Sequence, residues 1–267
     1  MNIYLELTAR FNTGRLRAVI CSGQATVLHR LAVMSKDGDW ILREDEETTA
    51  HVLAVLSEHG ARYRFGAPLD VRWLAGGWSS HFEFRRDRLR VRTDFFTRPP
   101  RIPAAELPEL WREQEGRDPP FVNLRHLADM KKTNRERDYA IIGELARLMT
   151  DARDRLLYSR SARDLKALAQ SHPDLARQLA PQRPVLTRVA EDRETLEAAL
   201  DAERRSLMHA NERRLALYAA AYEEWSREWR ALAAEIAALP LLEAHEIVVE
   251  RAEGVLPFRL SGAESDG

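Results

Sequence analysis

The sequence predicts an α+β fold, in which a mixed sheet flanked by helices is followed by an all-helical C-terminal domain. Residues 1–60 alternate between helix-like and strand-like patterns, and residues 61–96 contain closely spaced strand-like runs. Beyond Arg153 no strand pattern occurs until 247–249, and residues 191–239 contain neither glycine nor proline. Strand-rich segments followed by helix-rich segments are typical of α+β proteins.

The expected domains are 1–150, which contains the sheet, and 151–267, which contains a long helix near 191–239. In the first domain, apolar residues recur at helical spacing or in short alternating runs bounded by turn residues. The predicted helices span 2–12, 24–34, 46–59, 106–114 and 124–152, the last capped by Asn123. The predicted strands span 16–21, 37–42, 61–65, 69–74, 80–85 and 88–96, with Gly76-Gly77 as a hairpin turn. Repeated prolines make the rest of 97–120 a loop.

A stripe of large apolar residues follows the predicted long helix at alternating steps of four and three. Its members are Tyr218, Tyr222, Trp225, Trp229, Leu232, Ile236 and Leu239. This spacing is typical of a coiled-coil seam or an antiparallel helix pair, so another element must cover it. We expect either residues 135–180 or a second copy of the chain, which makes a homodimer or a partner protein possible at these helices. Residues 261–267 are small and acidic, and we expect them to be frayed.

Composition limits the class of protein. The chain has 267 residues, of which 45% are hydrophobic, enough to fill a core. Its formal net charge of -1 excludes a general electrostatic attraction to nucleic acid, so any such binding must use a local patch. The single cysteine, Cys21, cannot form an internal disulfide. Because there is no secretory leader pattern and no long apolar run, we expect a cytoplasmic protein that does not cross a membrane.

Three aspartates predict a magnesium site. Asp37 and Asp39 are two residues apart at the start of a strand, so their side chains share a face with Cα atoms roughly 6.5 Å apart. Asp94 would complete the cluster if its strand lies beside the first one. Mg²⁺ is usually held by few carboxylates and several waters, and it then binds substrate phosphates. The implied chemistry is phosphoryl or nucleotidyl transfer. The alternative is that Asp37-Gly38-Asp39 is a solvated turn and Asp94 only marks a strand end.

The order of these motifs resembles the minimal nucleotidyltransferases of the DNA polymerase beta-like superfamily, including toxin-like bacterial members. The resemblance covers roughly the first 150 residues. Its parts are the strand Ala18 to Cys21, the pair Ser22-Gly23, the helix 24–34, Asp37-Gly38-Asp39, Asp94, and the later segment with Lys131-Lys132, Arg135 and Asp138. The sequence has Ser22 where glycine is usual, and Gly38 where an apolar residue is usual.

The resemblance implies a role for each matching residue. Ser22 and Gly23 would lie against a triphosphate, and Asp37 and Asp39 would hold the metal ions. Asp94 would bind metal and activate the attacking hydroxyl. Lys131 would contact phosphate; we expect it to share one face of the predicted helix 124–152 with Arg135 and Asp138.

Two further groups have both a functional and a structural interpretation. Arg88, Arg90 and Arg92 share strand parity with Asp94, so they would place positive charge near a triphosphate or a nucleic acid. Alternatively, they pair with Glu83 and Asp87 at a sheet edge. Ser79, Ser80 and His81 suggest a nucleophile, but hydrolase catalysis also needs an orienting acid, and a hairpin explains these residues more simply.

The sequence therefore predicts a Mg²⁺-dependent nucleotidyltransferase that moves a nucleotidyl group from a nucleoside triphosphate to a hydroxyl on RNA, protein or a small molecule. One alternative is a catalytically silent fold that acts as a binding or interaction module, which the departures at Ser22 and Gly38 favour. Another alternative is the toxin of a toxin–antitoxin pair that acts on RNA.

Overall fold

The computed structural model describes residues 2–260 and divides the chain into two compact units. The sheet unit is formed by the residues up to Val122 together with those from Ala216 onward, and the helical unit is Asn123–Leu215. These bounds differ from the expected 1–150 and 151–267. The reason is that α11 (Arg193–Glu235) contributes its first part to the helical unit and its second part to the sheet unit. The segment 261–267 lies outside the described residues.

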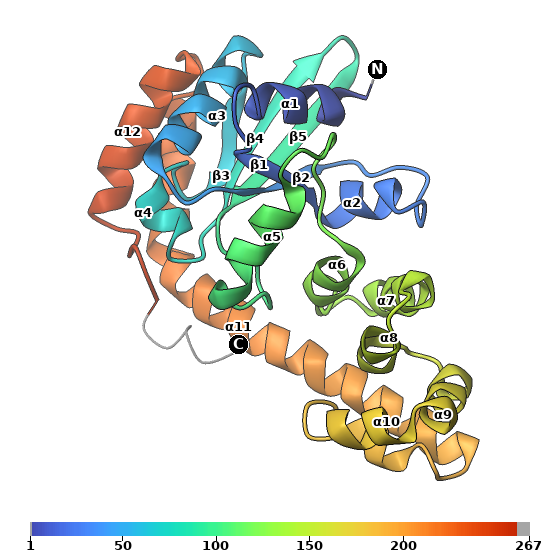
Figure 1. Ribbon diagram of the computed structural model, residues 1–267. Coiled ribbons are helices and arrows are strands. Elements are labelled where there is room, and N and C mark those ends of the chain that lie inside the picture. Colours follow the sequence, from blue (N-terminus) through green and yellow to red (C-terminus); the bar gives the residue numbers. More distant parts are fainter. Residues whose placement is uncertain (1, 261–267) are drawn as a thin grey trace. The chain divides into compact units, whose positions relative to one another are not determined.

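The sheet unit confirms the α+β class, with a five-stranded mixed sheet and helices beside it (Figure 1). The strands are β1 (Ala18–Cys21), β2 (Gly38–Leu42), β3 (Arg62–Gly66), β4 (Ser80–Arg86) and β5 (Leu89–Phe96), in the order β1-β2-β5-β4-β3. Strands β2 and β5 are parallel, and the other neighbours are antiparallel. The helices are α1 (Ile3–Phe11), α2 (Ser22–Leu28), α3 (Glu46–Glu58), α4 (Val71–Leu74), α5 (Leu107–Gln114) and α12 (Leu241–Glu253), with a 3₁₀ turn at Ala104–Glu106.

One face of the sheet is buried beneath α1. Trp40 is fully buried, stacks on Phe95 with ring centroids 5.4 Å apart, and donates its indole N–H to Thr8 Oγ1 of α1 at 2.9 Å. Phe11 of α1 packs edge-on against both rings. Because side chains alternate along a strand, the residues next to Trp40 and Phe95 belong to the opposite face. The hydrophobic pattern of β2 and β5 therefore leaves their aspartates away from this core.

Both edges of the sheet are covered by other parts of the same unit. At β1, Ile20 exchanges backbone hydrogen bonds of 3.0 Å with Pro120 and Val122. At β3, the aromatic stripe of α11 supplies three hydrogen bonds, from Trp225 Nε1 to the Gly66 carbonyl, from Trp229 Nε1 to the Arg64 carbonyl, and from the Gly66 N–H to the Tyr222 hydroxyl. Covered edges cannot pair with another chain.

The partner predicted for the aromatic stripe within the chain is wrong. The stripe does not pack on residues 135–180, but on Trp73, Trp78, the β3 edge and α12. Its spacing correctly indicated a buried helix face. The covering surface could not be read from the sequence because it is built from short, irregular segments that have no heptad pattern of their own.

Several predicted elements need correction. Residues 69–74 do not form a strand, because Asp70 caps the short helix α4 by accepting from the Arg72 N–H at 2.8 Å. Gly76-Gly77 therefore follows a helix and is not a hairpin turn. Residues 247–249 are helical: α12 buries Ala244, Val248 and Ala252 at steps of four, and this packing overrides the β-propensity of the Ile-Val-Val run. The helix predicted for 24–34 ends at Leu28.

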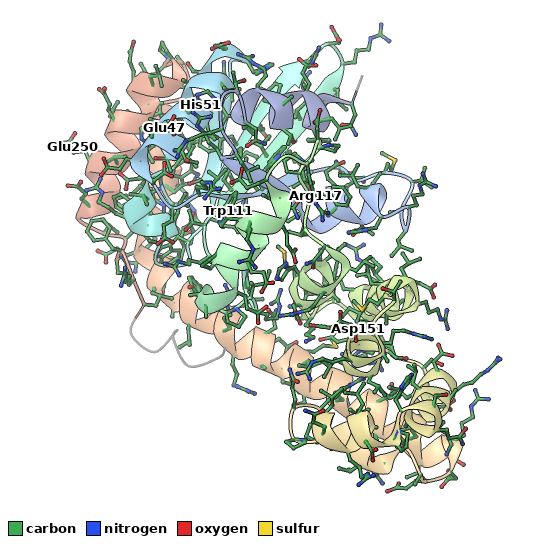
Figure 2. The ribbon with its side chains drawn as sticks, viewed as in Figure 1. Glu47, His51, Trp111, Arg117, Asp151 and Glu250 are labelled. Atoms are coloured by element: carbon green, nitrogen blue, oxygen red, sulfur yellow. The ribbon has the colours of Figure 1, made fainter. Side chains whose placement is uncertain are left out.

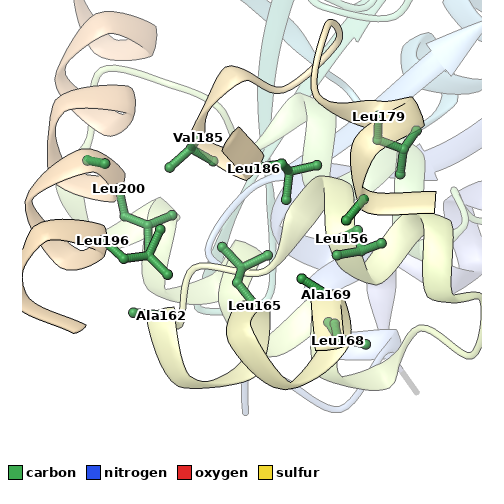
Figure 3. Close-up of a cluster of buried hydrophobic side chains, with 12 residues drawn as sticks. Leu156, Ala162, Leu165, Leu168, Ala169, Leu179, Val185, Leu186, Leu196 and Leu200 are labelled. Carbon is green, nitrogen blue, oxygen red and sulfur yellow. The ribbon is translucent and has the colours of Figure 1, made fainter. Parts of the chain in front are cut away.

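The helical unit contains two helices where one was predicted for 124–152, namely α6 (Leu124–Met130) and α7 (Glu136–Leu148). They are followed by α8 (Ala152–Tyr158), α9 (Ala162–Ser171), α10 (Pro173–Leu179), a 3₁₀ turn at Pro184–Arg188 and the first part of α11. Asn123 caps α6 as expected, since its side chain accepts from the His126 N–H. Leu156, Leu165 and Leu196 lie in one buried apolar cluster, shown in Figure 3. Among residues 2–260, no helix is both long and apolar enough to cross a membrane.

The buried Arg17 predicts an acid-sensitive contribution to stability. Its guanidinium hydrogen-bonds Glu47 of α3 at 2.7 Å (Glu47 is labelled in Figure 2) and lowers the pKa of that carboxyl from 4.5 to about 2. Because the folded pKa is depressed, this contribution is complete above about pH 4.5 and is lost as the pH falls toward 2.

Glu47→Gln is therefore expected to lower the free energy of unfolding at neutral pH, and its difference from wild type should shrink between pH 4.5 and 2. Urea unfolding across this pH range measures both effects. Glu46→Gln is the matched control, because this neighbouring carboxylate makes no ion pair with the residues that the structure describes. A difference that stays constant with pH would contradict the assignment.

Candidate functional site

The parallel register of β2 and β5 brings the candidate aspartates together. Asp39 is the direct neighbour of Asp94 in this register. One step earlier, Arg92 Nη1 lies 3.7 Å from Asp37 Oδ1. All four side chains belong to the sheet face opposite Trp40 and Phe95, and all are partly exposed. The sheet thus presents two acidic residues side by side, with a third beside an arginine.

The donor chemistry at this face fits Mg²⁺ bound together with a substrate. Asp37 Oδ1 is buried without a hydrogen-bond partner, so it is a polar atom that a cation would satisfy. Within residues 2–260 there is no group of three or more His, Cys, Asp or Glu side chains arranged to hold a metal ion by themselves. Mg²⁺ commonly needs only one or two carboxylates when phosphate oxygens and waters complete its shell. The residues therefore fit a metal that arrives with a phosphate ligand.

The turn between β1 and α2 is built for close contacts. Ser22 has φ +54°, in the left-handed region where glycine costs least. A Cβ on Gly23 would lie 2.2 Å from Ser35 Oγ, so any other residue here would have to displace the Ser35 side chain. The Gln24 amide then donates to the carbonyls of Ser35 and Asp37 at 3.3 Å. These contacts fix the backbone that carries Asp37.

Packing explains why position 38 is occupied by glycine. A Cβ at this position would lie 2.5 Å from the Tyr4 ring and 2.4 Å from the Trp40 ring. The Tyr4 hydroxyl also donates to the Lys36 carbonyl at 2.7 Å. Burial, and then the charge of Asp37, raise the pKa of Tyr4 above its ordinary value. An apolar residue at position 38 is therefore excluded by the aromatic pair, and glycine here is compatible with a functional site.

A basic pocket of about 1000 Å³ borders Asp37. Two of its lining residues, Gln24 and Arg92, contact Asp37 directly. Its cationic lining residues are Lys36, Arg86, Arg88, Arg90 and Arg92. The structural interpretation of the arginines is confirmed for Arg90, which pairs with Glu83 at 2.6 Å. Arg92 instead pairs with Asp37, and its role toward a phosphate stays a prediction. Arg88 lies in the β4–β5 turn, one residue before β5 begins.

Lys131 lies in the helical unit and not on one continuous helix with Arg135 and Asp138. It is the C-cap of α6, whereas Arg135 is the N-cap of α7. The break occurs at Thr133, which accepts from the Arg135 N–H and donates to Asp138. The three charged residues still converge, because the buried Asp138 lies 3.5 Å from Lys131 Nζ and 2.8 Å from Arg135 Nη2. The predicted shared helix face is therefore wrong, although the predicted proximity is right.

A hydrogen-bonded chain links Ser79 and His81 to Asp94. Ser79 Oγ is 2.9 Å from His81 Nε2, and His81 Nδ1 is 2.7 Å from Asp94 Oδ1. Sequence reasoning set these residues aside because it identified no orienting acid. The acid is Asp94, the register partner of His81 across β4 and β5. Ser80 does not take part, because it is buried and donates to the Ala67 carbonyl at 2.6 Å.

Comparisons with known proteins add little. No protein family and no curated protein matches the sequence. A solved structure described as a "putative nucleotidyltransferase from H. pylori" aligns with 78% of this chain and 94% of that chain, at 12% identity and a TM-score of 0.37. A likeness this distant does not indicate the function of the chain.

Proposed function

We propose that the protein is a metal-dependent nucleotidyltransferase, which moves a nucleotidyl group from a nucleoside triphosphate to an acceptor hydroxyl. The observation that carries this proposal is the β2–β5 register, which sets Asp39 beside Asp94 with Asp37 one step before them on the same face. The resemblance of the motif order to polymerase beta-like nucleotidyltransferases supports the same reaction. The basic pocket beside Asp37 supports a polyanionic substrate.

Asp37, Asp39 and Asp94 would supply the carboxylates for the metal, one or two of them at a time, with phosphate oxygens and waters completing its shell. Bound Mg²⁺ would neutralise charge on the triphosphate and align the attacking and leaving oxygens. The backbone at Ser22-Gly23 would lie against the triphosphate, as the resemblance implies. Arg92 and Lys36 would attract phosphate oxygens at the pocket wall. We assign Lys131 a phosphate contact as well, on the resemblance alone.

The reaction balances without a further reagent. The acceptor hydroxyl oxygen forms a bond to the α-phosphorus, and the bond from that phosphorus to the oxygen bridging to the β-phosphate breaks. Pyrophosphate leaves, and the hydroxyl proton passes to the Asp94 carboxylate. Asp94 can receive it because, within residues 2–260, its hydrogen bonds and ion pairs all involve Oδ1, so Oδ2 is left available.

The test is label transfer. The purified protein is incubated with each labelled nucleoside triphosphate and Mg²⁺, with total RNA or cell lysate supplying acceptors, beside an Asp37→Ala/Asp39→Ala variant. Transfer by wild type but not by the variant supports the proposal, and the labelled product identifies RNA, protein or a small molecule as the acceptor class. Equal transfer by both proteins refutes it.

A second candidate function is a catalytically silent module that only binds. The engagement of Asp94 Oδ1 by His81 and Arg64, and the lack of a three-residue metal group in the described chain, favour it. It predicts no label transfer under any condition, whether or not a nucleoside triphosphate binds. The same incubation, repeated with equilibrium binding of labelled nucleotide, separates it from the enzyme.

A further inference from the structure

We propose that Ser79 and His81 are positioning residues for Asp94, which they hold through a directional chain of hydrogen bonds so that one carboxylate oxygen stays available. This inference rests on the proposed nucleotidyl transfer and names a support of its reaction site that the motif pattern does not contain. An ionised carboxylate only accepts hydrogen bonds, so His81 Nδ1 must be the donor in the 2.7 Å contact with Asp94. In the neutral imidazole, His81 Nε2 then accepts from the Ser79 hydroxyl at 2.9 Å.

The imidazole of His81 sits in a slot that fixes its plane. The Phe65 ring stacks on it with centroids 4.2 Å apart and planes 24° apart. On another side Gly66, at φ +97°, leaves room for the ring, because a Cβ there would lie 2.6 Å from His81 Cδ2. The side chain of His81 is only 15% exposed. A ring held this way can donate to Asp94 without first losing rotational freedom.

The backbone around the slot is held as well. The Ala67 N–H donates to the Ser79 carbonyl at 3.0 Å, which fixes the backbone of Ser79 just before β4 begins. Gly66 donates its N–H to Tyr222 and accepts from Trp225, so the slot is anchored to α11. The Ser79–His81 pair is therefore a preorganised support rather than a chance surface contact.

As a consequence, the two carboxylate oxygens of Asp94 have different surroundings. Oδ1 takes the His81 bond and lies 3.5 Å from Arg64 Nη1. Oδ2 has no such contact with residues 2–260, so it is available to a metal ion or an acceptor hydroxyl. Carboxylates that bind metals are usually oriented by a hydrogen bond of this kind, and losing it typically weakens metal affinity by about 10- to 100-fold.

The same three residues could instead be a hydrolytic triad with Ser79 as nucleophile, but the neighbouring backbone does not favour it. A triad also needs free N–H donors for the oxyanion of the intermediate. Two nearby donors are already used, because the Gly66 N–H binds Tyr222 and the Ala67 N–H binds the Ser79 carbonyl. The positioning role needs no such donors, so it is the one we infer.

The experiment compares wild type with His81→Leu, His81→Asn and Ser79→Ala, and with His209→Leu as a control at an exposed histidine of the helical unit. Binding of Mn²⁺ with a non-hydrolysable nucleoside triphosphate is measured by electron paramagnetic resonance, beside kcat and KM for transfer. His81→Leu should weaken Mn²⁺–nucleotide binding by about 10- to 100-fold. His81→Asn should recover most of the loss, because its amide N–H can replace the Nδ1–H donor.

A spectroscopic readout tests the direction of the chain independently of turnover. In mildly alkaline buffer, where an ordinary imidazole is neutral, ¹⁵N NMR should show His81 protonated at Nδ1 in wild type. Ser79→Ala should let the Nε2-protonated form appear.

The possible failures can be told apart. Wild type that binds and transfers, with His81→Leu unchanged or His81 protonated at Nε2, overturns the positioning role and leaves the proposed function standing. Wild type that neither binds Mn²⁺–nucleotide nor transfers refutes the function and the positioning role together. Covalent labelling by a fluorophosphonate that Ser79→Ala abolishes would identify a nucleophile and also overturn the positioning role.

Discussion

Asp39→Asn is expected to lower nucleotidyl transfer by about 10²- to 10³-fold or more, with little change in the unfolding midpoint. The substitution keeps the size of the side chain but removes the negative charge that would hold a metal at the centre of the β2–β5 pair. Asp39 is only partly buried and asparagine has the same size, so the unfolding midpoint should change little. The loss should appear in kcat, because the metal would stabilise the charge of the transition state more strongly than the charge of the bound substrate.

Transfer rates measured across Mg²⁺ concentrations, together with thermal unfolding, give both quantities. The matched control is Asp174→Asn, in the first turn of α10, where the aspartate side chain is 88% exposed. It should keep wild-type transfer. If Asp39→Asn retains wild-type kcat at saturating Mg²⁺, Asp39 does not bind the catalytic metal.

Local features of the site could be predicted from the sequence. Strand alternation predicted that Asp37 and Asp39 share a face, and both belong to the face opposite Trp40 in the structure. Asp94 was expected beside them on the condition that its strand lies next to theirs, and β5 does pair with β2. The roles of these residues, as opposed to their positions, stay predictions until a metal or substrate is measured.

The chain from Ser79 through His81 to Asp94 could not be predicted, for a physical reason. A cross-strand pair depends on register, and the register of β4 and β5 follows from the length of their turn. The hairpin was expected at Gly76-Gly77, but those glycines follow α4. The turn that sets the register lies between β4 and β5. It contains Asp87, which has a positive φ, and it places His81 opposite Asp94.

The sequence also could not predict which surface covers the apolar stripe of α11. Periodicity shows that a helix face is buried, but it does not show against what. The covering residues are a sheet edge and two tryptophans, Trp73 and Trp78, which lie about 150 residues earlier in the chain. The same long separation explains why the expected domain boundary at 150 differs from the division at Val122 and Ala216.

Trp225→Ala is expected to lower the free energy of unfolding of the sheet unit by about 3–5 kcal/mol. Trp225 is fully buried and packs with Trp229 in a cluster that also contains Trp73 and Trp78. Its indole N–H donates to the Gly66 carbonyl at 2.9 Å on the outer edge of β3. Truncation would therefore leave a large cavity and also uncover an edge-strand acceptor, which is a site for pairing with another chain.

The two contributions can be separated with Trp225→Phe, which keeps much of the apolar volume but removes the N–H. It should cost less than the alanine variant, about 1–3 kcal/mol from the unsatisfied Gly66 carbonyl together with the volume lost. Leu217→Ala, on an exposed position of the same helix, should change stability by no more than about 0.5 kcal/mol. Urea unfolding followed by tryptophan fluorescence and circular dichroism measures all three. If Trp225→Ala were as mild as Leu217→Ala, the second part of α11 would not hold the β3 edge, and the slot around His81 would lose the anchor at Gly66 on which its rigidity depends.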